Sequence, residues 1–191
     1  MYNMNQLRFK MSVSIENKIY PNIIENHVLK ALSYYPELQL TPIEFRFKTT
    51  IKKSTMQAQP RFSKIFSGRK SREYLIFIKE KLELGNIQTP IENLPEDVII
   101  GWLGHELGHI VDYEIRTNSE LVSFGINYLF SKKAIISAER TADRFAVEHG
   151  MKDYILKTKD FILNHADIPE KYKTRIKKYY LSTEELMQIA E

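Results

Sequence analysis

The segment GWLGHELGHIVDY, residues 101–113, restricts the fold of this chain more than any other stretch of its 191 residues. On a helical wheel drawn at about 100° per residue, its two histidines point away from a continuous apolar stripe. Three glycines fall within eight residues of the segment, and an interior glycine costs a helix about 1 kcal/mol relative to alanine. The sequence therefore predicts a helix, starting near Pro95, whose second face lies very close to another part of the molecule. The apolar stripe consists of Ile99, Ile100, Leu103, Leu107, Ile110 and Val111.

The second face of this helix carries the pattern His-Glu-x-x-His, formed by His105, Glu106 and His109. Histidines four positions apart on a helix are about 5–6 Å from each other, so both can bind one zinc ion. A glutamate beside the first histidine can orient and deprotonate a metal-bound water. Because the pattern also arises by chance, it needs a second, independent signal.

That signal lies in AIISAERTADRFAVEHG, residues 134–150, where two acids share the apolar side of a second helix. Glu139 and Asp143 fall on the same side of the wheel as Ile135, Ile136, Ala142, Ala146 and Val147. A buried carboxylate without a partner is strongly unfavourable, so these two acids need a cation. We therefore expect Glu139 to be the third metal ligand and Asp143 to accept a hydrogen bond from a ligand imidazole. Three protein ligands leave a position open, which is the arrangement of a catalytic zinc site.

Several other residues are candidates for roles at the site. Asp112, Glu114 and Glu120 are alternative third ligands, although Asp112 points past the metal unless the helix breaks. The longer pattern His-Glu-x-x-His-x-x-Gly-x-x-His is excluded because Asp112 and Ile115 stand at its glycine and third histidine. His149 is a candidate donor to the oxyanion of a tetrahedral intermediate. Its alternative role is to stabilise the C-terminus of a helix.

The rest of the chain predicts an α+β fold, with strands in the first half and helices in the second. Gly150 is expected to end the glutamate-bearing helix, and Ser182 with Glu185 forms a capping-box pattern before the last helix. The expected elements are a helix between Pro21 and Pro36, strands in 41–51, 56–58 and 74–78, a loop over 85–95, helices over 119–130 and 134–149, and an all-helical tail over 151–191.

Composition narrows the functional classes. The chain has no cysteine, which excludes disulfides and thiolate metal sites. No signal peptide and no run of about 20 apolar residues is seen, so we expect a soluble, cytoplasmic protein without a membrane span. The net charge of +4 and the basic run KYKTRIKK, residues 171–178, are typical of a solvated helix face, and no nucleic-acid-binding motif accompanies them.

The motifs HELGH and ERTAD together resemble those of the gluzincin zinc metallopeptidases, whose second motif is Glu-x-x-Ala-Asp. More narrowly, residues 40–150 are similar to the minigluzincins. The resemblance implies one Zn²⁺ bound by His105, His109 and Glu139, with Glu106 as general base and acid and Asp143 as the partner of His105. It also implies a zincin-type core with a short, mostly antiparallel sheet, a backing helix, an active-site helix and a glutamate helix. Residues 151–191 have no counterpart, so we expect a metallopeptidase domain over 1–150 and a helical extension over 151–191.

The function expected from these motifs is zinc-dependent hydrolysis of peptide bonds in a peptide or protein substrate. We expect the substrate to add as a further strand along Tyr74 to Lys79. One alternative is a metal-binding module without peptidase activity, or a latent one whose site is covered by residues 52–70 or by the tail. A nucleic-acid-associated protein that uses the basic tail is a weaker alternative.

Overall fold

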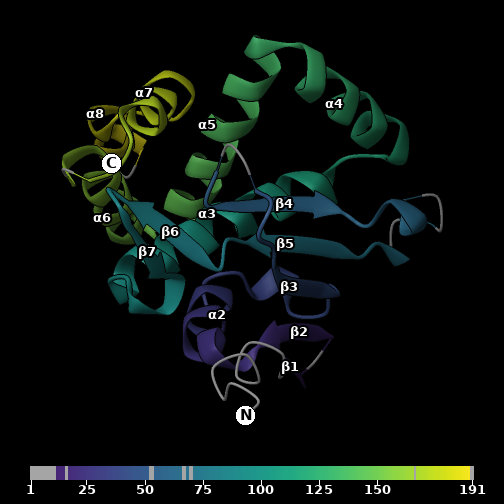
Figure 1. Cartoon of the computed structure of the whole chain (residues 1–191). Coiled ribbons are helices and arrows are strands. Elements are labelled where there is room, and N and C mark those ends of the chain that lie inside the picture. The colour runs from purple at the N-terminus through teal and green to yellow at the C-terminus, as the bar shows by residue number, and fades with distance from the viewer. Residues whose placement is uncertain are drawn as a thin grey trace.

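The computed structural model describes residues 12–15, 17–51, 54–65, 68, 71–165 and 167–189, and it has an α+β fold, as predicted. A mixed sheet crosses the middle of the molecule in Figure 1, with α2 (Glu25–Leu32) near the β1–β2 edge and the C-terminal helices near the other edge. Within the described residues this sheet has five strands in the order β1-β2-β3-β5-β4. The strands are β1 (Ser12–Ile15), β2 (Lys18–Pro21), β3 (Ile43–Phe47), β4 (Met56–Pro60) and β5 (Tyr74–Ile78).

The main sheet is mixed, with parallel pairings beside the antiparallel ones that the sequence predicts. Strand β3 is parallel to both of its neighbours, β2 and β5, whereas β1–β2 and β4–β5 are antiparallel. The chain returns from β2 to β3 through α2, and a crossover of this kind places two strands parallel. Strand β5 lies between β3 and β4, so β4 is the edge strand on the side of the C-terminal helices.

A second, two-stranded sheet follows β5 along the chain, and its second strand falls within residues 85–95, which were predicted to be a loop. Strands β6 (Lys81–Leu84) and β7 (Ile87–Pro90) pair as an antiparallel hairpin. Gly85 adopts φ +58° in the turn, a backbone conformation that glycine adopts without steric cost. The short 3-10 helices are η1 (Asn22–Ile24), η2 (Pro36–Leu38), η3 (Phe62–Lys64) and η5 (Ile91–Asn93).

The central helix is α3 (Glu96–Ile115), and residues 98–113 are buried along its whole circumference. One face packs toward the sheet and α2, and the other packs against α5 (Lys132–Glu148) and α6 (Lys152–Asn164). The helix α4 (Asn118–Phe130) joins α3 to α5, and α7 (Glu170–Tyr179) and α8 (Thr183–Ile189) complete the fold. Ser182 and Glu185 hydrogen-bond reciprocally in front of α8, so the predicted capping box is confirmed.

The C-terminal helices share the core of the molecule. Ile155, Ile162, Ile176 and Leu186 belong to the same buried cluster as the apolar residues of α3 and the sheet. No helix in the described part of the chain is long and apolar enough to cross a membrane.

Candidate metal centre and cleft

Three residues that could bind a metal ion meet between α3 and α5. The Nε2 atoms of His105 and His109 lie 3.1 Å and 3.6 Å from Oε2 of Glu139. Each residue offers one ligand atom, and these atoms all lie within 4.8 Å of one another. All three side chains are buried, so the group is part of the protein interior rather than a chance cluster of surface charges.

The glycines of α3 explain how α5 comes so close. A Cβ atom added at Gly108 would lie 2.5 Å from the backbone oxygen of Ala142, which sits between Glu139 and Asp143 on α5. At Gly101 the added atom would lie 2.4 Å from the backbone oxygen of Tyr154 on α6. Since no side chain fits in either place, the close backbone approach expected from the sequence is confirmed.

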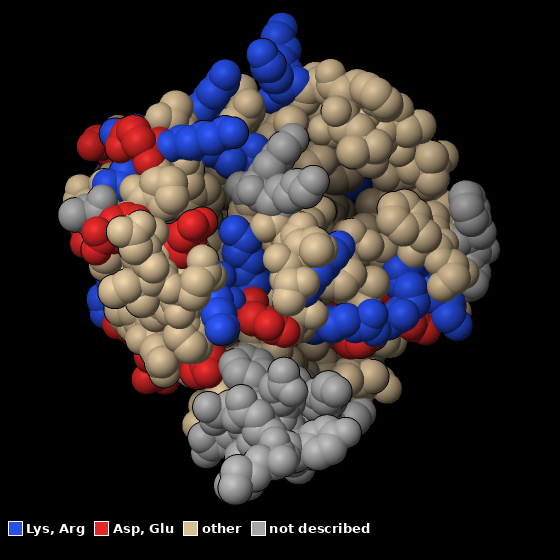
Figure 2. Space-filling model, in the orientation of Figure 1, with Lys and Arg blue, Asp and Glu red and all other residues tan. Residues whose placement is uncertain are grey.

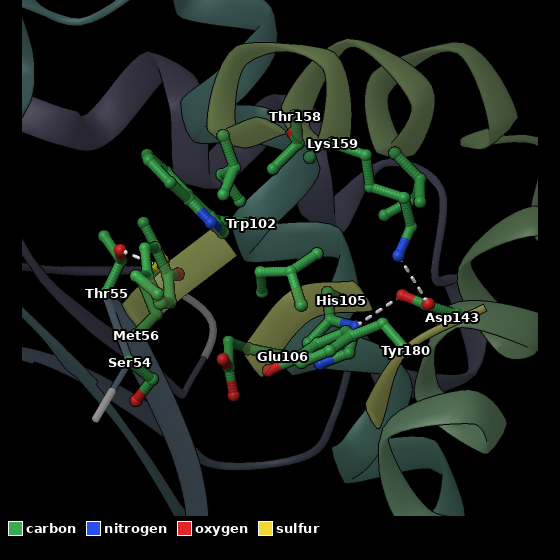
Figure 3. A pocket seen from close by; sticks show the side chains of 15 residues that line it. Ser54, Thr55, Met56, Trp102, His105, Glu106, Asp143, Thr158, Lys159 and Tyr180 are labelled. Atoms are coloured by element: carbon green, nitrogen blue, oxygen red, sulfur yellow. Dashed lines mark hydrogen bonds and ion pairs between the residues drawn. The ribbon is translucent and has the colours of Figure 1, made fainter. Parts of the chain in front are cut away.

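Asp143 holds the first histidine in place. Its Oδ1 lies 2.9 Å from Nδ1 of His105, and its Oδ2 accepts hydrogen bonds from Nζ of Lys159 at 2.9 Å and from the backbone N–H of Leu181 at 3.0 Å. Figure 3 shows His105, Asp143 and Lys159 joined in this order, with the ring of Tyr180 beside the His105 ring. Although burial raises the pKa of Asp143, Lys159 and His105 outweigh that effect and keep it below its usual value. The carboxylate therefore stays ionised and fixes the imidazole with Nε2 directed at Glu139.

The charges in the cluster fit a metal ion. Burial alone would lower the pKa of His105, but hydrogen bonds to Asp143 and Glu139 raise it to about 10. Burial also raises the pKa of Glu139, but its contacts with the two histidines bring it well below its usual value. The carboxylates thus demand a positive charge at the imidazoles, which a proton or a metal ion can supply. Two imidazole nitrogens and one carboxylate oxygen are ligands that divalent transition metals bind.

Glu106 stands next to this cluster with its carboxylate on the sheet side. Its Oε2 accepts a hydrogen bond of 2.6 Å from the backbone N–H of Ala58 on the edge strand β4. Burial raises the pKa of Glu106, although His109 and His105 act in the opposite direction. In Figure 3 the Glu106 side chain points away from Asp143, toward the strand that carries Met56. This placement leaves the carboxylate able to take up and release a proton near the metal ligands.

The second oxygen of Glu139 has partners outside α3. The hydroxyl of Tyr128 on α4 donates a hydrogen bond of 2.6 Å to Oε1 of Glu139. Nη2 of Arg175 on α7 lies 3.9 Å from the same oxygen. Oε2 is therefore left to face the two histidines.

The cluster opens into a groove of about 760 Å³ between β4 and α4. Glu106, His109 and Glu139 lie in its wall, and Lys48 and Arg175 are the cations among its described lining residues. In Figure 2 the surface over α4 is almost free of charged side chains. A smaller cavity of about 30 Å³, shown in Figure 3, continues beside Glu106 and His105 toward Trp102 and Thr158. The apolar lining of the groove comes mainly from Ile51, Met56, Phe62, Ile65, Leu121, Val122, Phe124, Ile126 and Leu129.

Two sequence-based expectations about the surroundings of the site are corrected. A substrate cannot add along Tyr74 to Lys79, because β5 is paired on both sides; among the described strands, β4 is the edge strand that lines the groove. His149 is not brought to the cluster, since its Nε2 lies 2.6 Å from Glu37, its Nδ1 lies 2.6 Å from the backbone oxygen of Phe145, and its ring stacks on Tyr35.

Two of the three alternative third ligands, Asp112 and Glu120, have other partners. Asp112 pairs with Arg116 in the last turn of α3. Glu120 forms a capping box with Thr117 at the start of α4. Within the described ranges, the group that could hold a metal ion is His105, His109 and Glu139.

Four contributors were missed by sequence reasoning: Lys159, the Leu181 N–H, Tyr128 and Arg175. For Lys159 a signal was present, because it lies four residues after Ile155 and three before Ile162, on the apolar side of its helix. A charge in that position is the same signal that identified Glu139 and Asp143. A backbone N–H such as that of Leu181 leaves no trace in a sequence.

Comparison with known proteins gives no match: no family model, no curated protein and no solved structure is significantly similar to this chain.

Proposed function

We propose that the protein is a zinc-dependent peptidase of the gluzincin type. The observation that carries the proposal is that Glu106, His109 and Glu139 line one groove, and that His105 completes with His109 and Glu139 a buried group of three possible metal ligands. Closed structural zinc sites have four protein ligands, whereas hydrolytic sites have three. The resemblance of the two motifs to gluzincins supports the same proposal.

Zinc is the metal that this donor set favours, because it binds two histidines and one glutamate in known hydrolytic sites. When bound, it would polarise the scissile carbonyl and make a water more acidic. Residues of the chain transfer the proton and hold the reacting groups in place. Glu106 accepts a proton from the attacking water and delivers it to the leaving nitrogen. The Ala58 N–H holds the Glu106 carboxylate, and Asp143 holds the His105 ring.

The groove indicates the kind of substrate. Its walls are mostly apolar, and its acids, among the described residues, are Glu106 and Glu139, which the site itself uses. The Ala58 N–H points out of the sheet edge toward Glu106, so Met56, two residues earlier, presents its backbone groups to the same side. We infer that an extended peptide with large apolar side chains lies along β4 and against α4.

Glu106→Gln tests the proposal. The variant should bind one zinc per chain as the natural protein does, because residue 106 is not a ligand. It should lose peptide cleavage by at least about a hundredfold, because the base is gone. Metal content by mass spectrometry and digestion of a peptide library measure the two effects. Glu96→Gln, an exposed substitution on the same helix, is the matched control.

Undiminished cleavage by Glu106→Gln would contradict the mechanism. Zinc binding by the natural chain without cleavage of any library peptide would instead favour the metal-binding module without peptidase activity, or a latent form of it.

A further inference from the structure

Arg175, one of the cations of the basic run 171–178, does not lie on the solvated face that the sequence predicts. Arg175 lines the groove together with Glu106, His109 and Glu139, and its side chain is 20% exposed. Lys171, Lys177 and Lys178 of the same run are exposed. α7 therefore directs a single cation of this run at the candidate metal centre.

The guanidinium of Arg175 has few polar partners among the described residues. Its Nε atom is buried and has no hydrogen-bond partner among the described residues. Its Nη2 atom is 3.9 Å from Oε1 of Glu139, beyond hydrogen-bond distance, and that oxygen is already bound by Tyr128. The ring of Tyr179, whose centroid is 5.0 Å from Cζ, supports the guanidinium from one side. Arginine presents five N–H donors in a planar fork suited to anionic oxygens, so donors remain available here.

We propose that Arg175 donates hydrogen bonds to the negatively charged oxygen that forms on the substrate during hydrolysis, which makes α7 part of the active site. This inference rests on the proposed peptidase function. It assigns a role that the two motifs leave empty, since neither His105, His109 nor Glu106 is available to stabilise that oxygen. His149 is bound to Glu37, and the hydroxyl of Tyr128 donates to Glu139.

The chemical step shows why a donor is needed. The water oxygen forms a bond to the carbonyl carbon, and Glu106 takes the proton that the water loses. The π electron pair of the carbonyl moves onto its oxygen, which becomes an anion. When this electron pair forms the carbon–oxygen double bond again, the carbon–nitrogen bond breaks, and the nitrogen leaves with the proton from Glu106. The products are a carboxylic acid and an amine, and Arg175 stabilises the anion between the two steps.

The rival role for Arg175 is that of a simple counter-ion for Glu139. The two roles differ in what they predict. A counter-ion would compete with the metal, so its removal would change zinc affinity and leave the turnover of zinc-loaded protein unchanged. An oxyanion donor acts after the substrate is bound, so its removal lowers kcat and leaves zinc affinity and KM nearly unchanged.

The experiment compares Arg175→Met with Lys177→Met, which removes an exposed charge from the same helix. For the zinc-loaded full chain, Arg175→Met should lower kcat by about 10²–10³-fold, with KM and the zinc dissociation constant within about threefold of the natural values. Binding of a phosphonate peptide, which carries an anionic tetrahedral group, should weaken by a similar factor when measured by calorimetry. Lys177→Met should change none of these quantities, and Arg175→Lys should restore part of the loss.

Suppose that the natural chain cleaves peptides and that Arg175→Met has the same kcat and the same phosphonate affinity as the natural chain. This result would overturn the role of Arg175 and leave the peptidase function standing. A shift in zinc affinity without a fall in kcat would also overturn it in favour of the counter-ion. Absence of cleavage by the natural chain would instead remove the peptidase function on which the inference rests. Arg175→Gln serves as a second variant if the methionine variant does not fold.

Discussion

Asp143 illustrates how a buried carboxylate is tolerated in this protein. The residue is 1% exposed, and its two oxygens have three partners: His105, Lys159 and the Leu181 N–H. The sequence suggested that both Glu139 and Asp143 depend on the metal for their charge balance. The structure divides this task, because Lys159 neutralises Asp143 and the imidazoles face Glu139.

Lys159→Met should therefore be damaging. Breaking a buried ion pair by removing one partner costs about 3–5 kcal/mol, and loss of support for a ligand histidine weakens metal binding by about 10–100-fold. Urea unfolding and zinc titration measure the two effects. The control is Lys157→Met on the same helix as Lys159, which breaks an exposed pair with Asp97 of α3 and should change little. Equal behaviour of the two variants would show that Lys159 does not support the site.

The contact between α3 and α5 determines whether the ligands can meet at all. His105 and His109 belong to one helix and Glu139 to the other, so the spacing of the two helices sets the distances within the cluster. Gly108 allows that spacing, because the backbone of Ala142 occupies the place where a side chain would begin.

Gly108→Ala should push α5 away from α3. Overpacking of this kind costs about 1–3 kcal/mol, and we expect the displaced Glu139 to reduce zinc affinity by tenfold or more. The control is Gly125→Ala on α4, where the added atom would meet nothing within 4 Å. That substitution should be neutral or stabilise the helix by up to about 1 kcal/mol. Thermal unfolding and zinc titration of both variants distinguish a specific clash from a general effect of alanine, and full zinc affinity in Gly108→Ala would contradict the explanation.

The C-terminal helices are part of the same core as the rest of the molecule. They contribute core residues and two of the groups that surround the site, Lys159 and Arg175, and the segment between α7 and α8 contributes the Leu181 N–H. The helices themselves could be predicted, and so could His105, Glu106, His109, Glu139 and Asp143, because periodicity places such residues on definite faces. What could not be predicted is the order of the strands and the residues that α4, α6 and α7 bring to the site. These depend on how elements distant in the sequence pack, which local patterns do not encode.

A chain ended after Gly150 should consequently fail to form the site. Asp143 would lose Lys159 and the Leu181 N–H, and the core would lose Ile155, Ile162, Ile176 and Leu186. We expect loss of cooperative unfolding and of zinc binding, measured by circular dichroism and metal analysis. A shortened chain that is folded and more active than the full chain would instead support the view that the tail covers a latent site.

Removal of zinc should lower the stability of the intact chain. A ligand at a hundred times its dissociation constant stabilises the folded state by about 2.7 kcal/mol. For a chain of this size that corresponds to a rise in Tm of roughly 5–11 °C, which a chelator should abolish. His109→Ala provides the control, because a chelator should leave its Tm unchanged. If neither zinc nor a chelator changed the Tm of the natural chain, the cluster would not be a metal site.

The hydrogen bond from the Ala58 N–H to Glu106 does not depend on the side chain of residue 58. Because the donor is a main-chain amide, replacing Ala58 by any residue small enough for its buried position retains the bond. Proline is the exception, since it carries no N–H. Under the proposed function, substitutions in β4 can therefore change the peptide preference one side chain at a time, while the Glu106 carboxylate keeps its orientation.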